Sequence, residues 1–484
     1  MSVQSNLKRR IGRTAVAMAC TWLAGCASVP YEVPAMPLPA AYHEAQETGA
    51  ARAARNTVAP DWWRAYHDAT LDALLVRIDV SNQSLLKSVA LLRDARAQVD
   101  AARADYFPTI GATASVTSTH LSANVLGHSR AGMTTPDHLL GLGATWEPDL
   151  FGRIGNNVDA AEARVQASTD DVAAVRLGLQ AEAAIDYFGI RSLDREAALL
   201  EQTVDAYASV LQLVTNRYRG GIAAESDVAQ AQAQLDSTRA QLTDLHLSRS
   251  QLLHALATLL GEPASTFSLA VADATPAASG SNGIALPATP VAVPSTLLQR
   301  RPDIAAAERR VAAANAQIGV ARAAFFPTLM LNLNGGLDSS GLAGWLTAPS
   351  RFWAVGPALA ATIFDGGKRQ AGVDSARAQF DASAADYRQT VLKAVQDVED
   401  NYAALRLLDD EATSQRAAVA ASGRALQQAT ERYRKGAVAY LDVNVVQAAA
   451  LTDARALEAV HRKQLAASVS LFRAWGGGWE ERAE

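Results

Sequence analysis

Cysteine is almost absent from this sequence, and so is any long apolar run beyond its N-terminal end. Only Cys20 and Cys26 occur among its 484 residues. A chain cleaved before Cys26 keeps one thiol, which excludes a disulfide and a thiolate metal site from the mature protein. No apolar stretch of the roughly 20 residues that a membrane-spanning helix requires occurs downstream. A mature chain that crosses a membrane is therefore expected to cross it with strands.

Signatures of catalysis and of nucleic-acid binding are missing as well. The sequence contains neither an HExxH motif nor a Gly-x-Ser-x-Gly elbow. Gly366-Gly367-Lys368 is not a phosphate loop, because Thr362 stands where the first glycine of that loop is needed. The net charge is −5, and no basic patch is interleaved with aromatic residues. We expect no enzyme activity, no cofactor, no metal site and no nucleic-acid partner.

The N-terminal residues look like a targeting segment. Residues 8–13 are rich in lysine and arginine, and residues 14–22 form an apolar stretch too short to span a bilayer. Leu23-Ala24-Gly25-Cys26 resembles a bacterial lipobox, in which cleavage exposes the cysteine for acylation; the alternative is an ordinary signal peptide with a chance cysteine. Ala27 replaces the aspartate that usually signals inner-membrane retention. We expect Cys26 to carry a lipid anchor in the outer membrane.

The rest of the chain uses one pattern twice: helix, β-hairpin, long helix, tip and returning helix. Tyr106-Phe107-Pro108-Thr109 returns as Phe325-Phe326-Pro327-Thr328, where a first helix must end. Six segments follow from this reading: a signal peptide (1–25), a lipidated extended tether (26–60), the first structural repeat (61–263), a linker (264–293), the second structural repeat (294–478) and a C-terminal tail (479–484).

Strands are expected where the apolar period changes from 3.6 to 2. Apolar and small or polar residues alternate in four stretches, two in each repeat: 110–117, 140–146, 329–334 and 353–363. Three of the eight histidines lie in the predicted surface loop of the first hairpin: His120, His128 and His138. We expect them to be solvated, because a loop rarely gives metal ligands the supporting hydrogen bonds they need.

Each repeat also predicts one very long helix. The first runs from about Asn157 to Arg217, which is roughly 90 Å at 1.5 Å per residue. Its apolar residues recur every seven positions from Val158 to Leu179, with small residues at the companion positions. The same seam begins again at Val373. This spacing is typical of closely packed, coiled-coil helices.

A basic and aromatic run ends each long helix. Arg217-Tyr218-Arg219-Gly220-Gly221 returns as Arg432-Tyr433-Arg434-Lys435-Gly436, 215 positions later (432 − 217). Asp227 and Asp442 each stand ten residues after the first arginine. We name these turns tip 1 (residues 217–227) and tip 2 (residues 432–442). In each, glycine is expected to close one helix in the left-handed conformation before a second helix returns.

Four strands cannot close a barrel, and an open sheet edge is prohibitive in lipid. The strands are therefore expected to be shared between copies of the chain. Two copies give eight strands and three give twelve. The small polar residues of the alternation fit the larger, water-filled case.

The whole chain, from the lipobox to Trp475, resembles the outer membrane factor family of TolC-like channels, in the lipoprotein branch that serves RND-type efflux pumps. The most specific residues are Asp61-Trp62-Trp63, the tract from Arg300-Arg301-Pro302-Asp303-Ile304 to Pro327, and the paired tips. The resemblance implies an α+β membrane protein with duplicated helical coiled-coil hairpins and four transmembrane strands per chain. It also implies a homotrimer with a 12-stranded β-barrel, a 12-helix periplasmic tunnel, a periplasmic adaptor partner and an inner-membrane RND transporter.

The resemblance also assigns the tips. It places Asp442 in an acidic ring at the periplasmic constriction and makes Tyr433 part of the latch; the alternative is that Asp442 is a first-turn helix residue facing water. The family's gating arginine and second aspartate fall at Val438 and Val445, so the latch is expected to differ here, with Arg432, Arg434 or Lys435 as the candidate substitutes. The expected adaptor-contact residues are Arg217, Tyr218, Arg219, Gly221, Asp227 and Gly436.

We therefore predict an outer membrane exit channel of a tripartite efflux pump in a Gram-negative bacterium, passively conducting drugs or other small molecules. Two alternatives stay open: a channel for type I protein secretion, and a periplasmic coiled-coil scaffold without a pore. The strand alternation disfavours the scaffold. The sequence does not specify the substrates.

Overall fold

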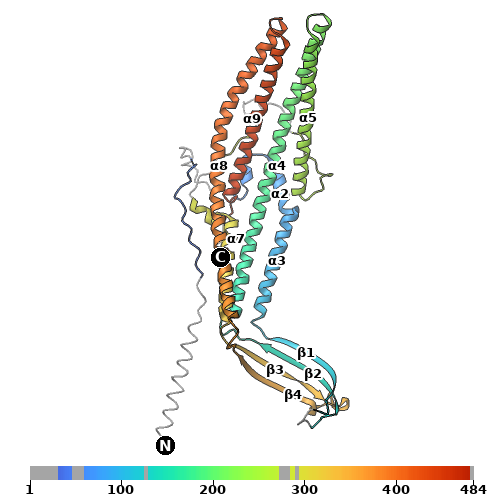
Figure 1. Cartoon of the computed structure of the whole chain (residues 1–484), viewed down its shortest axis with the longest axis vertical. Coiled ribbons are helices and arrows are strands. Elements are labelled where there is room, and N and C mark those ends of the chain that lie inside the picture. Colours follow the sequence, from blue (N-terminus) through green and yellow to red (C-terminus); the bar gives the residue numbers. More distant parts are fainter. Residues whose placement is uncertain (1–30, 46–58, 125–128, 272–283, 289–293, 480–484) are drawn as a thin grey trace. The chain divides into compact units, whose positions relative to one another are not determined.

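A computed structural model describes residues 31–45, 59–124, 129–271, 284–288 and 294–479. They fall into two compact units (Figure 1). Unit 1 lies within Met1–Ala35, Leu91–Ser168 and Ala306–Arg388, and unit 2 within Met36–Ala90, Thr169–Ala305 and Gln389–Glu484. Cys26 and His128 lie outside the described residues. No helix in the described part of the chain is both long and apolar enough to cross a membrane.

The order of elements repeats, as the sequence predicts. The first half contains η1 (Trp62–Tyr66), α2 (Ala69–Ser81), α3 (Gln83–Ala104), β1 (Thr109–His120), β2 (Thr134–Trp146), α4 (Arg153–Arg219) and α5 (Glu225–Leu259). The second contains η2 (Pro294–Thr296), α6 (Leu297–Arg300), α7 (Pro302–Ala323), β3 (Thr328–Ser339), η3 (Leu342–Gly344), η4 (Ala348–Ser350), β4 (Arg351–Ala360), α8 (Lys368–Arg434) and α9 (Tyr440–Ala474).

In unit 1 the four strands form one antiparallel sheet in the order β1-β2-β3-β4. The register aligns the apolar residues of all four strands on one face. Ala144 lies opposite Ile110 and also opposite Leu333, which in turn lies opposite Val355. Because successive side chains of a strand point to opposite faces, the alternate residues share the other face.

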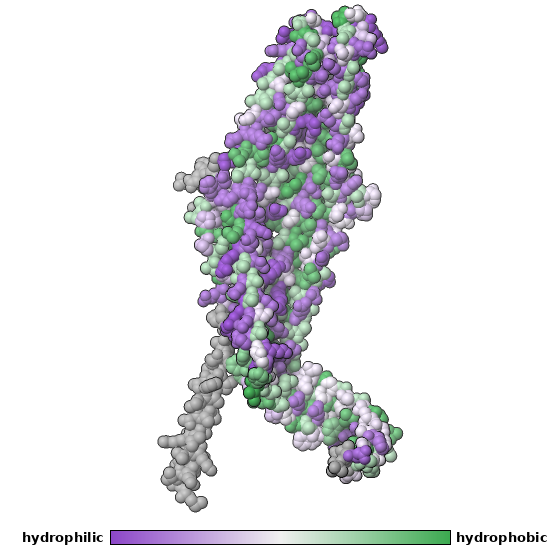
Figure 2. Space-filling model, in the orientation of Figure 1, coloured by the Kyte–Doolittle hydropathy of each residue, from purple (hydrophilic) through white to green (hydrophobic). Residues whose placement is uncertain are grey.

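The second face of the sheet carries mostly small and polar residues, with Leu139, Met330 and Phe352 as its large apolar members. Gly143 of β2 pairs with Gly111 and with Asn334, and Asn334 pairs with Ala354. Figure 2 shows little strongly hydrophilic colour over the sheet compared with the helices. The two faces confirm the alternation that the sequence predicts.

Several strand boundaries differ from the prediction. β2 begins at Thr134, so Pro136 and His138 lie in the strand, and His120 is the last residue of β1 rather than a loop residue. The His120 ring shares a 2.8 Å hydrogen bond with the Thr134 hydroxyl. β4 ends at Ala360, short of the predicted 363, because its partner β3 begins at Thr328, opposite Ala360.

The core of unit 2 is built on aromatic residues near the start of the first repeat. Trp62 stacks on Phe472 at 5.6 Å, and Tyr66 lies 4.9 Å from Phe188. The helical stretch predicted after Asp61 is interrupted at Asn82, whose side chain accepts a hydrogen bond from the Leu85 N–H at 2.9 Å. That bond caps the first turn of α3.

Residues 31–45 contain neither helix nor strand, as their prolines predict. The part of this segment that belongs to unit 2, residues 36–45, packs against the helices of that unit. The Tyr42 ring packs against Tyr402 and Trp475 at 5.8 and 5.9 Å. The Glu399 carboxylate accepts hydrogen bonds from the backbone N–H groups of His43 and Glu44, at 2.7 and 2.9 Å. Residues 42–44 are therefore part of the folded core of unit 2.

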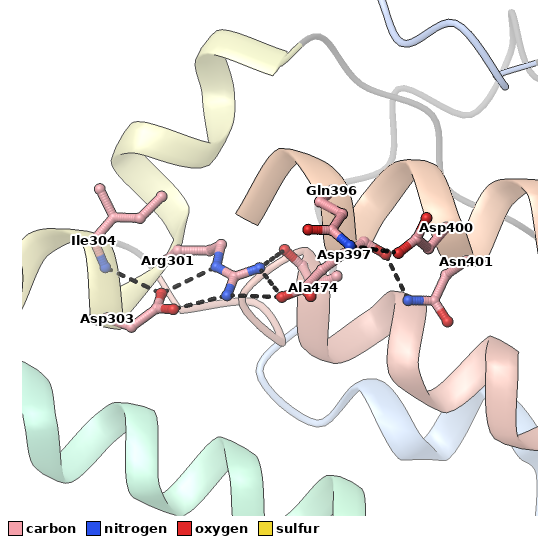
Figure 3. A network of polar contacts seen from close by, with 8 residues as sticks. All are labelled: Arg301, Asp303, Ile304, Gln396, Asp397, Asp400, Asn401 and Ala474. Atoms are coloured by element: carbon pink, nitrogen blue, oxygen red, sulfur yellow. Dashed lines mark hydrogen bonds and ion pairs between the residues drawn. The ribbon is translucent and has the colours of Figure 1, made fainter. Parts of the chain in front are cut away.

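A largely buried arginine, Arg301, joins three segments of unit 2 (Figure 3). Arg301 donates a bidentate pair of hydrogen bonds to Asp303, at 2.7 and 3.0 Å, and further bonds to Asp397 and to the Ala474 carbonyl at 3.2 and 3.3 Å. Burial opposes the charge of Arg301, but hydrogen bonding to Asp303 and the charge of Asp397 outweigh it and raise the pKa of the guanidinium. The Arg-Pro-Asp tract thus ties the start of α7 to α8 and to the end of α9.

Candidate functional site

The two tips are built by the same local chemistry. At tip 1 the N–H groups of Gly221 and Ile222 bond to the carbonyls of Tyr218 and Arg217, both at 2.9 Å, and Gly221 has φ +76°. This pair of bonds is a Schellman motif, which needs a left-handed residue and therefore favours glycine. The predicted helix stop at Gly221 is confirmed.

Tip 2 repeats that geometry. The N–H groups of Gly436 and Ala437 bond to the carbonyls of Tyr433 and Arg432, again both at 2.9 Å, and Gly436 also has φ +76°. The motif ends α8 as its counterpart ends α4. The duplication thus extends to individual backbone hydrogen bonds.

Asp227 and Asp442 begin the returning helices α5 and α9. Each carboxylate accepts a hydrogen bond from the backbone N–H three residues earlier, that of Ala224 at 3.3 Å and that of Ala439 at 3.2 Å. This is the acidic half of a capping box; the alanines have no side-chain oxygen to supply the other half. Both aspartates therefore have a helix-capping role within one chain, and Asp442 is exposed to solvent.

Arg217 connects the two tips. Its guanidinium donates hydrogen bonds to the carbonyls of Tyr433 and Arg434, both at 3.0 Å, and lies 4.4 Å from the centre of the Tyr433 ring. Carbonyls in the last turn of a helix have no partner within it and carry the negative end of the helix dipole, so they favour a cation. The residue predicted for adaptor contact is thus turned toward the neighbouring hairpin.

Tyr433 is enclosed by both hairpins. Its side chain is 5% exposed and packs in a cluster with Val214 of α4 and with Tyr440 and Val443 of α9. The rings of Tyr433 and Tyr440 are 5.8 Å apart in an edge-to-face arrangement. Burial, with smaller contributions from neighbouring tyrosines and Asp227, raises the pKa of Tyr440 to about 12. Tyr440 is therefore neutral at physiological pH.

The Tyr433 hydroxyl is buried and forms no hydrogen bond with any of the described residues. Within one chain Tyr433 therefore acts through its ring and its carbonyl. The hydrogen bond expected of a latch tyrosine needs a partner from another molecule and stays a prediction.

The remaining predicted tip residues are outward-facing. Tyr218 is 43% exposed, and Arg219, Arg432 and Arg434 are exposed too. Arg434 pairs with Glu431 of its own helix at 3.0 Å. The structure thus brings Arg217 and Tyr433 together and leaves the other basic residues at the surface.

Two further sets of contacts join the same hairpins away from the tips. The Arg195 guanidinium of α4 lies 3.0 Å from Glu458 of α9. In the opposite direction Arg455 of α9 lies 2.7 Å from both Glu196 of α4 and Gln241 of α5. Sequence reasoning missed these pairs and Tyr440, because neither the repeat nor the heptad spacing indicates which hairpin faces which.

No cluster of three or more histidine, cysteine, aspartate or glutamate side chains suited to a metal ion occurs in the described ranges. The site therefore consists of helix ends, one inter-hairpin arginine, an aromatic pair and two capping carboxylates. Such an arrangement can hold two hairpins together or release them.

Comparison with known proteins gives matches along nearly the whole chain. A family model described as "Outer membrane efflux protein" matches residues 74–262 and 293–477. Outer membrane protein OprJ of Pseudomonas aeruginosa is 33% identical over 98% of this chain and 97% of OprJ. Cation efflux system protein CusC of Escherichia coli O6:H1 is 30% identical over 96% of this chain and 98% of CusC.

The fold is shared with solved structures. The outer-membrane channel OprN superposes with a TM-score of 0.83 at 28% identity, covering 94% of this chain and 99% of OprN. The open-state MtrE channel of Neisseria gonorrhoeae superposes with a TM-score of 0.78 at 26% identity, covering 93% and 98%. Both likenesses include the two repeats.

Proposed function

The chain belongs to the outer membrane efflux protein family, and we propose that three copies of it form the exit duct of a tripartite efflux pump. As a member of this family it is an outer membrane efflux channel. We further propose that it conducts small molecules passively, without catalysis, and that a periplasmic adaptor and an inner-membrane RND transporter are its partners.

The observation that carries this proposal is the sheet. Its strands have 10 to 13 residues, and one continuous face is apolar. β1 and β4 are the outer strands of the sheet, each paired on one side among the described residues. Joining β4 of one copy to β1 of the next removes both edges, and three copies give a closed twelve-stranded wall with the small polar residues inside.

Planar-bilayer conductance of the purified protein tests the proposal. We expect discrete channel openings. We also expect the mass of the assembly to correspond to three subunits. A trimeric protein that never conducts, even with Asp442 replaced by alanine, would contradict the channel role. A deletion strain that loses protein export but keeps its resistance to toxic compounds would instead support a secretion channel.

We infer that tip 2 narrows the periplasmic end. Three Asp442 carboxylates would form a ring that attracts cations and repels itself. The hydrogen bond between Asp442 and the Ala439 N–H supplies a separate, structural role, so a charge test must preserve that bond. Asparagine does so, because its side-chain oxygen still accepts a hydrogen bond while the charge is lost.

Asp442→Asn is expected to lower the cation preference of the leak and raise the leak conductance, and Asp442→Ala to raise the conductance further because the cap is lost as well. Reversal potentials and single-channel recordings measure both effects. The matched control is Asp227→Asn, which removes the equivalent charge from tip 1. Equal effects at the two positions would remove the special role assigned to Asp442.

We also propose that Cys26 is acylated. Several buried acyl chains, at about 0.8 kcal/mol for each CH₂ group, hold a protein durably to a bilayer. Cells fed a palmitate analogue are expected to label the natural protein and a Cys20→Ala variant but not Cys26→Ala. A labelled Cys26→Ala protein would contradict acylation at this residue.

A further inference from the structure

The two tips are duplicates that are used unequally within one chain. Arg217 of tip 1 bonds to the carbonyls of Tyr433 and Arg434 and lies over the Tyr433 ring. Its counterpart Arg432 is exposed, and its side chain makes no hydrogen bond, ion pair or ring contact with any residue that the structure describes. Within one chain, the Arg217 guanidinium thus has hydrogen-bond acceptors and the Arg432 guanidinium has none among the described residues.

The acceptors show the same inequality. Tyr218 and Arg219 stand 215 positions before Tyr433 and Arg434 and form the same Schellman-closed helix end. Tyr218 is 43% exposed, whereas Tyr433 is 5% exposed. Tip 1 thus offers the aromatic face and the last-turn carbonyls that Arg217 finds at tip 2.

We propose that Arg432 makes the same contact between subunits that Arg217 makes within one. In this proposal, which rests on the homotrimer proposed above, the Arg432 guanidinium of one copy donates to the Tyr218 and Arg219 carbonyls of a second copy and covers the Tyr218 ring. The partner is a second copy of this chain.

Symmetry gives the physical reason. In a closed ring each hairpin has two neighbours, and a head-to-tail contact repeats identically around the ring. The chain supplies one neighbour through Arg217, so the other must come from an adjacent copy. A cation at a helix C-terminus is favoured by the dipole and by the last-turn carbonyls, each of which has a second lone pair to offer, whichever chain supplies the cation.

The contact between copies differs in one respect from the contact within a chain. Tyr440, whose edge meets Tyr433, has Glu225 as its counterpart in the first repeat (440 − 215). In the contact between copies, the residue that stands in the place of Tyr440 is therefore a carboxylate rather than an aromatic ring. Because exposed charges are screened by salt, the contact between copies is the more salt-sensitive of the two.

Paired cysteines test this assignment in the full-length protein. Arg217→Cys with Arg434→Cys marks the contact seen within one chain, and Arg432→Cys with Arg219→Cys marks its duplicate. The cross-linker is the shortest bismaleimide that links Cys side chains at positions 217 and 434. Mass spectrometry of the cross-linked peptides identifies that linkage. Single-cysteine variants control for collisions.

On denaturing gels without reductant, the 217/434 pair is expected to run as a monomer and the 432/219 pair as covalent dimers and trimers. A 432/219 variant that is trimeric by mass but gives only monomers would overturn the inference and leave the proposed function intact. A protein that is not trimeric at all would contradict the proposed function itself.

Discussion

Replacing Arg217 with alanine is expected to raise the leak conductance of the reconstituted channel about tenfold. The change removes two charge-assisted hydrogen bonds to the Tyr433 and Arg434 carbonyls and a cation–π contact with the Tyr433 ring. Hydrogen bonds to charged groups contribute about 1.5–3 kcal/mol, and partial exposure at the tip favours the lower end. About 1.4 kcal/mol corresponds to a tenfold change in an equilibrium constant. The equilibrium between the closed and open arrangements of the hairpins should therefore shift about tenfold toward the open one.

Single-channel recordings at fixed salt measure this effect as the fraction of time spent in the open state. Arg219→Ala is the matched control, because it removes an arginine from the same tip whose side chain is exposed. Tyr433→Leu should reproduce part of the effect by removing the ring while keeping the carbonyl. If Arg217→Ala and Arg219→Ala behave alike, the contact between the tips does not restrain opening.

Gly476→Ala is expected to lower the free energy of unfolding by more than about 3 kcal/mol. This loss should exceed that of Gly436→Ala, because Gly476 is crowded as well as left-handed. A left-handed conformation costs a non-glycine residue about 1–2 kcal/mol, and Gly476 has φ +82°. A Cβ there would also lie 1.7 Å from the Arg300 carbonyl oxygen. Moving that backbone would displace Arg301, which binds the Ala474 carbonyl at 3.3 Å.

The comparison variant is Gly436→Ala at tip 2. Gly436 has φ +76°, but a Cβ there would meet no heavy atom within 4 Å. It should therefore bear only the conformational cost of about 1–2 kcal/mol. Thermal dissociation of the trimer in detergent measures both, and Gly476→Ala should show the lower transition temperature and the lower yield of folded protein. Equal losses would mean that the crowding around Gly476 relaxes without cost.

Local patterns predicted the local structure well, because alternation and helix-stop signals depend on neighbouring residues. The two-faced sheet follows from residues such as Ile110 and Leu333, which the register brings onto one face. The left-handed glycines Gly221 and Gly436 follow from their place after a basic helix end. The boundary errors at His138 and after Ala360 arise because strand length depends on the partner strand.

The partners of the site residues could not be predicted in the same way. The Arg217 contact joins residues 216 and 217 positions apart, so it depends on how two hairpins face each other. Asp442 has a capping partner that its place at the start of α9 does predict, and this role competes with the one assigned by resemblance. The docking of Tyr42 against Tyr402 and Trp475 has no signal in the proline-rich segment that contains it.

The acceptors of the Arg217 contact are main-chain carbonyls, and this has an evolutionary consequence. Every amino acid carries a backbone carbonyl, so no substitution at Tyr433 or Arg434 deletes an acceptor. A mutation that removes the hydrogen bonds of this contact must therefore change the codon of Arg217. Random mutagenesis should therefore yield few mutations that remove these hydrogen bonds. The residues at positions 433 and 434 can change while the hydrogen bonds to their carbonyls persist.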